Sequence, residues 1–147
     1  EDGYVGIFSR SWYGRVMVER VEEFATTNEW DRAYGEMLEM EKEIYNYGSL
    51  ILKFFVVIDK DEQYSRFMAR ENNPDKHYKI TDEDWRNRGK WDAYIESMDE
   101  MLYRTNVDYA PWILVEGNQK YYARIKVMEE YLKRAKAHLE NLDNNKN

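Results

Sequence analysis

The sequence contains no cysteine in its 147 residues and only two histidines, His77 and His138. The absence of cysteine excludes disulfides, thiol catalysis and cysteine metal sites, and it suits a reducing compartment. Two histidines so far apart do not suggest a histidine metal cluster. The sequence also lacks an apolar stretch long enough to span a membrane, and it lacks a recognisable signal peptide. We therefore expect a cytoplasmic protein without a membrane partner.

Several catalytic motifs are missing as well. No G-x-x-x-x-G-K-[S/T] segment is present, so the chain has no loop of the type that cradles nucleotide phosphates. No pair of carboxylates follows a predicted strand, and no Ser-His-Asp triad or zinc-ligand spacing is visible. Asp59 is the one acid at the end of a strand-like run, and we expect it to cap the helix that follows.

Length, hydrophobicity and charge limit the remaining classes of fold and of binding partner. The length allows one ordinary domain with a single core, and 43% hydrophobic residues support a globular fold. The formal net charge of −7 argues against binding of duplex nucleic acid through the overall field. The charge is unevenly distributed, because basic side chains cluster between residues 66 and 90, whereas acids dominate 19–43 and 96–100.

Three apolar runs predict strands: YVGIF (4–8), LILKFFVVI (50–58) and WILVEG (112–117). Near-continuous apolar strands indicate burial on both faces, as in a parallel sheet covered by helices. Apolar residues recur at helical spacing in three further segments, which we assign to helices facing the core: 30–45, 94–102 and 128–142. The predicted fold class is therefore α/β, with a parallel sheet and flanking helices.

The turn after the first predicted strand, SRSWYGR (9–15), carries cations and hydroxyls. In open α/β sheets, ligands bind beyond the carboxyl ends of the strands. Arginine there suits bidentate contacts with phosphate or carboxylate groups. Arg10, Ser11 and Arg15 are therefore candidate anion ligands. The alternative is a surface arginine paired with a glutamate such as Glu19.

A basic region follows the second predicted strand. Residues 59–70 have a helical pattern that places Arg66 and Arg70 on one face. With the segment that follows, the region holds eight potentially basic side chains: Arg66, Arg70, Lys76, His77, Lys79, Arg86, Arg88 and Lys90. Such a local excess in an acidic protein predicts an anion site. The alternative is a solvated helix surface whose cations pair with nearby acids: Glu71, Asp75, Asp82, Glu83 and Asp84.

A third signal follows the last predicted strand, where Asn118, Lys120 and Arg124 lead into the final helix. Because helix N-termini favour anions, these residues could contact a phosphate or the edge of a nucleotide. Capping of the helix by Asn118 is the alternative explanation. Within the basic region, Thr81 and Asp84 have the spacing of a helix-capping pair.

Three blocks of the sequence together resemble a known family. GIFSRSWYGRVMVERV, LKFFVVIDKDEQYSRFMARENNPDKHYKITDEDWRNRGKWDAY and EMLYRTNVDYAPWILVEGNQKYYARIKV look like consecutive blocks of the second family of polyphosphate kinases. The resemblance runs from about Tyr4 to about Lys136 and is closest to the polyphosphate:AMP phosphotransferase branch, in which two such domains are fused. It implies a P-loop kinase fold similar to thymidylate kinase. It also implies phosphoryl transfer, with Mg²⁺, between inorganic polyphosphate and AMP, ADP or ATP.

The resemblance implies roles for the candidate residues. Arg10, Arg66 and Arg70 would act on the transferring phosphates as catalytic residues, and residues 72–90 would form a lid. The remaining phosphate-binding residues would be Ser11, Arg15, Lys76, Lys79, Arg86 and Arg88, and the nucleotide-binding residues would be Asn118 and Lys120. No residue is assigned as a metal ligand, because Ser9 stands where family members often have Asp or Asn. Cations suit this chemistry, since phosphoryl transfer depends on positioning and charge neutralisation.

The resemblance covers the C-terminal portion of a kinase domain, at residues 1–140, followed by a polar tail at 141–147. The family's parallel strand order is 2-3-1-4-5, and the three predicted strands would be numbers 3, 4 and 5. The missing P-loop strand would lie between 4–8 and 50–58, which would leave both with open edges. Open edges are costly. We therefore expect a homo-oligomer or pairing with a missing N-terminal segment.

The leading hypothesis is a polyphosphate-dependent nucleotide phosphotransferase, of which this chain is an incomplete catalytic domain that is inactive alone. A second hypothesis is a degenerate domain that binds polyphosphate or nucleotide, or only mediates assembly, within a fused protein. Ser9 favours that hypothesis. An ordinary nucleoside monophosphate kinase that uses ATP is a third possibility, although the number of cations in the lid favours a longer polyanion.

Overall fold

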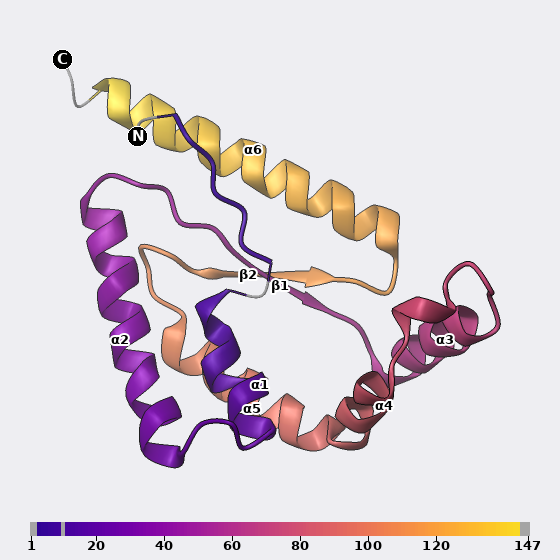
Figure 1. Ribbon diagram of the computed structural model, residues 1–147. Helices are drawn as coiled ribbons and strands as arrows, with labels where there is room; N and C mark the ends of the chain where they lie inside the picture. The colour runs from indigo at the N-terminus through magenta and orange to yellow at the C-terminus, as the bar shows by residue number, and fades with distance from the viewer. Residues whose placement is uncertain (1–2, 10, 145–147) are drawn as a thin grey trace.

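Two parallel strands lie between helices in the computed structural model, which describes residues 3–9 and 11–144 (Figure 1). The elements in chain order are η1 (Trp12–Val16), α1 (Val18–Val21), α2 (Thr27–Asn46), β1 (Lys53–Val57), α3 (Lys60–Glu71), η2 (His77–Lys79), α4 (Asp82–Gly89), α5 (Trp91–Thr105), β2 (Trp112–Glu116) and α6 (Lys120–Asn144). The predicted α/β class with a parallel sheet is confirmed.

The strands β1 and β2 pair in register from Lys53 opposite Trp112 to Val57 opposite Glu116. Helix α6 lies along one side of the pair, and α1, α2 and α5 lie on the other (Figure 1). Both strands are apolar runs, as expected for a sheet with helices on both faces. The cover is incomplete among the described residues, because burial alternates along β2 and Val56 of β1 is exposed. On the α6 side, Ile113 and Val115 form a buried cluster with Ala123.

The prediction of a strand at residues 4–8 is wrong. These residues form no strand in the structure, and Ile7 is 92% exposed. A strand requires a neighbour that satisfies its backbone hydrogen bonds. The two described strands pair only with each other, so no sheet edge holds the segment. The expected adjacency of the strands at 50–58 and 112–117 is correct, and β1 leaves its second edge unpaired among the described strands.

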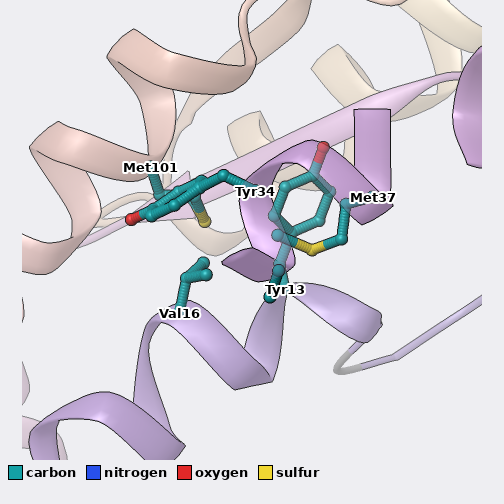
Figure 2. Close-up of a cluster of buried hydrophobic side chains, with 6 residues drawn as sticks. Tyr13, Val16, Tyr34, Met37 and Met101 are labelled. Atoms are coloured by element: carbon teal, nitrogen blue, oxygen red, sulfur yellow. The ribbon is translucent and has the colours of Figure 1, made fainter. Parts of the chain in front are cut away.

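The main core lies between η1, α2 and α5. Figure 2 shows Tyr13 and Val16 of η1 facing Tyr34 and Met37 of α2, with Met101 of α5 beside them. All five side chains are buried. The helical stripes predicted at 30–45 and 94–102 therefore do face a core, and the SWYG turn contributes Tyr13 to that core.

A buried ion pair connects this core to the sheet. Glu41 of α2 is fully buried, and its carboxylate accepts from Lys53 Nζ at 2.9 Å and from the Tyr13 hydroxyl at 2.8 Å. The Trp12 indole also donates to Glu41, at 3.2 Å. Lys53 Nζ further donates to the Thr105 carbonyl at 2.8 Å, at the end of α5. Burial lowers the pKa of Lys53, and the contact with Glu41 opposes that shift.

Two predicted caps are confirmed. The Asp59 side chain accepts from the Glu62 amide at the start of α3, at 2.7 Å. Thr81 and Asp84 form a reciprocal capping box at the start of α4. At the other end of the chain, helix α6 continues to Asn144 and so includes the first residues of the predicted polar tail.

Part of the apolar surface has no cover among the described residues. Val56 of β1 and Leu114 of β2 are 56% and 51% exposed. On α6, apolar side chains at three-, four- and seven-residue spacing face solvent: Ile125, Met128, Leu132, Leu139 and Leu142. The prediction that the helix at 128–142 faces a core is therefore wrong for the described residues, because no described element packs against this face. The described helices include none that is long and apolar enough to cross a membrane.

The buried pair predicts a large stability effect. Replacing Lys53 with Met leaves the Glu41 carboxylate buried without its cation, so we expect the free energy of unfolding to fall by about 3–5 kcal/mol. The double variant Lys53→Met with Glu41→Leu should recover part of that loss, because it removes the stranded charge. Urea denaturation measures both. As a control, Arg32→Met disrupts an exposed ion pair with Glu36 and should change stability by less than about 1 kcal/mol.

Candidate functional site

The carboxyl ends of β1 and β2 meet at a polar junction. The Asn118 side chain accepts from the Asp59 backbone amide at 3.1 Å and donates to the Asp59 carboxylate. Asp59 follows β1 and caps α3, whereas Asn118 follows β2 and precedes α6. The side chain of Asn118 thus ties the two strand ends together instead of capping α6, which was the alternative considered for it.

Gly117 allows this close approach. Its backbone amide donates to the Val57 carbonyl at 2.6 Å. A Cβ at this position would lie 3.0 Å from the Val57 carbonyl oxygen and 3.0 Å from the side chains of Val56 and Ile58. A larger residue would therefore push Asn118 away from Asp59 and displace the start of α6.

Arg66 bridges α3 to the same junction. Its guanidinium donates to the Gly117 carbonyl at 2.6 Å and to the Asn118 carbonyl at 3.0 Å. Its Nε also donates to Glu62 at 2.7 Å, one turn earlier in α3. The planar fork of arginine suits this arrangement, because several N–H donors can hold separate oxygens at once. Arg66 therefore fixes α3 beside the N-terminus of α6.

A basic pocket of about 410 Å³ lies between these two helices and the segment after α3. Its lining residues are Arg66, Ala69, Arg70, Lys76, Lys79, Lys120 and Arg124. Six of the seven are cations, and none is an acid. The pocket combines the second and third candidate regions of the sequence, which lie on opposite sides of β2 in the chain. We call this set of residues the basic pocket.

Few cations of the basic pocket form ion pairs with acidic side chains of the chain. Among the described residues, Arg66 pairs with Glu62, whereas no ion pair is recorded for Arg70, Lys76 or Lys120. The alternative in which the cations of this region pair with local acids therefore does not hold for the pocket. Because several like charges repel one another at close range, an anion in the pocket would relieve that repulsion.

The other arginines and Lys90 of the segment 72–90 have protein partners. Arg88 donates to the Lys60 carbonyl at 2.6 Å and to the Gln63 side chain at 3.0 Å, so it fastens α4 to α3. Arg86 lies 3.2 Å from Glu22 at the end of α1, and Lys90 lies 3.3 Å from the same carboxylate. Neither arginine lines the basic pocket.

The turn at 9–15 is only partly described. Arg10 lies outside the described residues. Ser11 precedes η1 without a side-chain capping bond, and Arg15 pairs with Glu19 at 2.8 Å. That pair is the one anticipated as the alternative to an anion ligand. Tyr13 of the same turn is a core residue whose hydroxyl is bound to Glu41, and burial followed by the charge of Glu41 raises its pKa.

The described residues do not supply a metal site of their own. No group of three or more Asp, Glu, His or Cys side chains within 3–9 and 11–144 could hold a metal ion. Asp59, at the tip of β1, already binds the Glu62 amide and Asn118. A divalent ion at this edge of the sheet would therefore depend on ligands from a bound molecule, such as phosphate oxygens.

A larger hollow of about 630 Å³ lies at the opposite end of the strands, beside the segment that leads into β2. It is lined by Lys42, Tyr45, Asn106, Val107, Asp108 and Tyr109. Lys42 stacks on both tyrosine rings, with Nζ 4.9 Å and 4.5 Å from their centroids. Because ligands in open parallel sheets bind at the carboxyl ends of the strands, the basic pocket is the better candidate site.

Sequence reasoning missed two features of the site. Arg124 was grouped with Asn118 and Lys120, but nothing in the sequence showed that it shares a pocket with Arg70 and Lys76. Glu22 was not singled out at all, although a carboxylate facing two lid cations organises that end of the molecule. A spacing rule within one helix could not reveal either relation, because the partners come from distant segments.

Comparison with known proteins gives consistent matches. A family model described as Polyphosphate kinase 2 (PPK2) matches residues 1–143. A polyphosphate:AMP phosphotransferase from Acinetobacter johnsonii is 51% identical over 133 residues, which are 90% of this chain and 28% of that protein. An AMP/ADP-polyphosphate phosphotransferase from Meiothermus ruber is 37% identical over 120 residues, 82% of this chain and 45% of that protein. The chain therefore spans less than half of either relative.

A solved structure agrees with the sequence matches. The crystal structure of Polyphosphate Kinase 2 from Arthrobacter aurescens TC1 superposes with a TM-score of 0.87 at 36% identity, covering 95% of this chain and 48% of that one. This chain therefore matches about half of that solved chain.

The junction predicts a pH effect on stability. The hydrogen bond from the Glu62 amide, followed by that from Asn118, lowers the pKa of Asp59. Such a carboxylate contributes stability above its unfolded pKa of about 3.9, and the contribution is lost as the pH falls through the lower folded-state value. We expect Asp59→Asn to lose less stability than the parent between about pH 7 and about pH 3 in urea denaturation. Equal losses would contradict this assignment.

Proposed function

The chain belongs to the polyphosphate kinase 2 family, and we propose that it takes part in phosphoryl transfer between inorganic polyphosphate and an adenine nucleotide, AMP or ADP. The observation that carries the proposal is the basic pocket at the carboxyl ends of the strands, with six cations and no acid in its lining. In an acidic protein of net charge −7, such a pocket suits a highly charged anion.

We assign polyphosphate to the basic pocket. Arg66 and Arg70 of α3 would contact phosphate oxygens together with Lys76 and Lys79 of the segment after α3. Arg66 is held in place by the carbonyl groups of Gly117 and Asn118, so its geometry costs little reorganisation. Arginine and lysine next to the transferring group stabilise the charge that spreads over its oxygens. The names of the relatives support both polyphosphate and adenine nucleotides as substrates.

Asn118 and Lys120 are the proposed contacts to the nucleotide. Lys120 is the first residue of α6, where the exposed amides of the helix add to its own positive charge. Asn118 lies beside it at the end of β2 and is fixed by Asp59. Arg10, Ser11 and Arg15 remain proposed phosphate ligands from the turn before η1, and Arg86 and Arg88 from the lid.

Mg²⁺ is the proposed metal. The acids at the strand ends do not form a protein site for it, since Asp59 is bound elsewhere. Mg²⁺ commonly binds through substrate phosphates with few protein ligands. It would therefore neutralise phosphate charge as a companion of the substrate, while the residues of this chain bind and orient the polyanion.

We propose that additional polypeptide completes the active site. The sequence contains no P-loop motif, and the second edge of β1 is unpaired among the described strands. The row of exposed apolar residues on α6 gives such a segment a surface to cover. On this view the chain alone binds polyphosphate but does not transfer phosphate.

A second copy of the chain is the other possible cover for this surface. Sedimentation velocity across protein concentrations distinguishes the two, because only covering by a second copy makes the chain associate with itself.

Polyphosphate binding tests the assignment of the pocket. We expect long-chain polyphosphate to bind the chain with strong salt dependence. Arg70→Ala with Lys76→Ala should weaken binding by at least about tenfold at low salt and should flatten the salt dependence, because fewer counterions are released. Titration at two salt concentrations measures both effects.

The matched control removes the same charge elsewhere. Lys133→Ala with Lys136→Ala lies on an exposed part of α6, away from the basic pocket. If this control weakens binding as much as the pocket variant, binding follows the net charge and the pocket assignment fails. If the parent, folded by circular dichroism, does not bind polyphosphate, the proposed function of this chain is overturned.

Ser9 distinguishes an active domain from a degenerate one. In the full-length polypeptide that contains this sequence, we expect polyphosphate-dependent phosphorylation of AMP or ADP by the unmodified protein, with Ser9→Asp changing the rate by less than about tenfold. An inactive parent that Ser9→Asp makes active would instead indicate a degenerate, binding-only domain. The assay follows nucleotide product with and without Mg²⁺.

A further inference from the structure

Glu22 is a buried carboxylate that faces the lid. Its side chain is only 5% exposed, and it lies 3.2 Å from Arg86 Nε and 3.3 Å from Lys90 Nζ. The Tyr94 hydroxyl donates to it at 3.5 Å from α5. Burying an acid in this way is unfavourable unless cations and hydrogen bonds compensate it. The two lid cations supply that compensation.

The backbone next to Glu22 is also unusual. Glu23 has a φ of 59°, the only positive value for a residue other than glycine within the described residues. This left-handed conformation is disfavoured for residues with a side chain, and such positions often mark functional sites. It ends α1 sharply and leaves Glu22 facing α4 and α5, where Figure 1 shows the end of α1 beside the start of α5.

The attachments of α4 show what Glu22 controls. Trp85 and Arg88 connect α4 to α3: Trp85 stacks edge-on against Phe67, and Arg88 donates to the Lys60 carbonyl. Lys90 also accepts a backbone hydrogen bond from the Tyr94 amide of α5, at 3.1 Å. Apart from that bond and the links to α3, the hydrogen bonds and ion pairs that join α4 or Lys90 to other described elements end on Val21 or Glu22. Glu22 is thus the one carboxylate, among the described residues beyond α3, that holds the lid.

We infer that Glu22 is a positioning residue, which orients Arg86 as a further phosphate contact for a polyanion bound at the basic pocket. Arg86 faces Glu22 through Nε, and its side chain is 54% exposed. Its Nη2 also lies 3.9 Å from the exposed carboxylate of Glu83 in α4. A guanidinium carries five N–H donors, so donors beyond these two contacts are available to a second oxygen-rich partner. A long polyphosphate has many equivalent phosphates and can extend from the pocket along the lid. This inference rests on the proposed binding of polyphosphate.

Glu22→Gln separates positioning from general electrostatics. The variant removes a negative charge near the lid, so the overall field alone would tighten the binding of a polyanion. Loss of positioning has the opposite sign, and we expect binding of long-chain polyphosphate about fivefold weaker, the net worth of one ordinary hydrogen bond, because Arg86 would be less well oriented rather than removed. In an Arg86→Ala background, Glu22→Gln should cause no further weakening, since the oriented group is already absent.

Glu100→Gln is the matched control. Glu100 also ties α1 to α5, through Arg20 at 2.6 Å, but it touches no lid cation. It carries the same change in charge and should leave polyphosphate affinity unchanged or slightly higher. Thermal unfolding of each variant shows whether it is folded at the assay temperature. If Glu22→Gln does not fold, the polyphosphate affinity of Arg86→Ala tests the inference instead, because this variant alters an exposed side chain and should fold.

The outcomes are distinct. The inference is overturned if Glu22→Gln binds as tightly as the parent, if its effect persists in the Arg86→Ala background, or if Arg86→Ala leaves binding unchanged. In each of those cases the parent still binds polyphosphate through Arg70 and Lys76, so the proposed function stands. If the parent does not bind polyphosphate, the proposed function fails first and the inference falls with it.

Discussion

The buried pair of Lys53 and Glu41 is the constraint on which the arrangement of this molecule depends. It places a lysine at the first position of β1 and surrounds its ammonium group with a carboxylate of α2, the Tyr13 hydroxyl and the last carbonyl of α5. Each of these groups would be costly to bury alone. The network therefore specifies one relative placement of η1, α2, α5 and the sheet, since a shift of any element leaves a charge or a donor unpaired.

That placement positions the site at the other end of the strands. Because β1 and β2 are parallel and adjacent, their carboxyl ends deliver Asp59 and Asn118 to the same point, and Gly117 permits the contact. Arg66 then holds α3 against the start of α6. A pocket of like charge can persist there because the surrounding frame is fixed by other interactions, which is the usual relation between a rigid scaffold and a strained functional surface.

The sequence predicted what depends on local pattern. Two strands, the core-facing stripes at 30–45 and 94–102, the Asp59 cap and the Thr81–Asp84 pair follow from periodicity and spacing, and all are present in the structure. The stripe at 128–142 does lie on a helix, but its apolar side chains are exposed rather than in a core. The segment 4–8 has the same apolar character as the true strands, but pairing needs a neighbour that pattern alone cannot reveal. Likewise, local spacing could not show that Lys120 joins the cations of α3, or that Lys53, within a strand-like run, carries a buried charge.

The cations of α3, of the segment that contains η2 and of α6 form one proposed polyanion site. Acetylation of lysine amines, read by mass spectrometry with and without long-chain polyphosphate, tests it on the unmodified chain. We expect polyphosphate to protect Lys76, Lys79 and Lys120 together, with no change at Lys133 on the exposed part of α6. Equal reactivity of all four lysines in both conditions, or uniform protection of every exposed lysine, would contradict it.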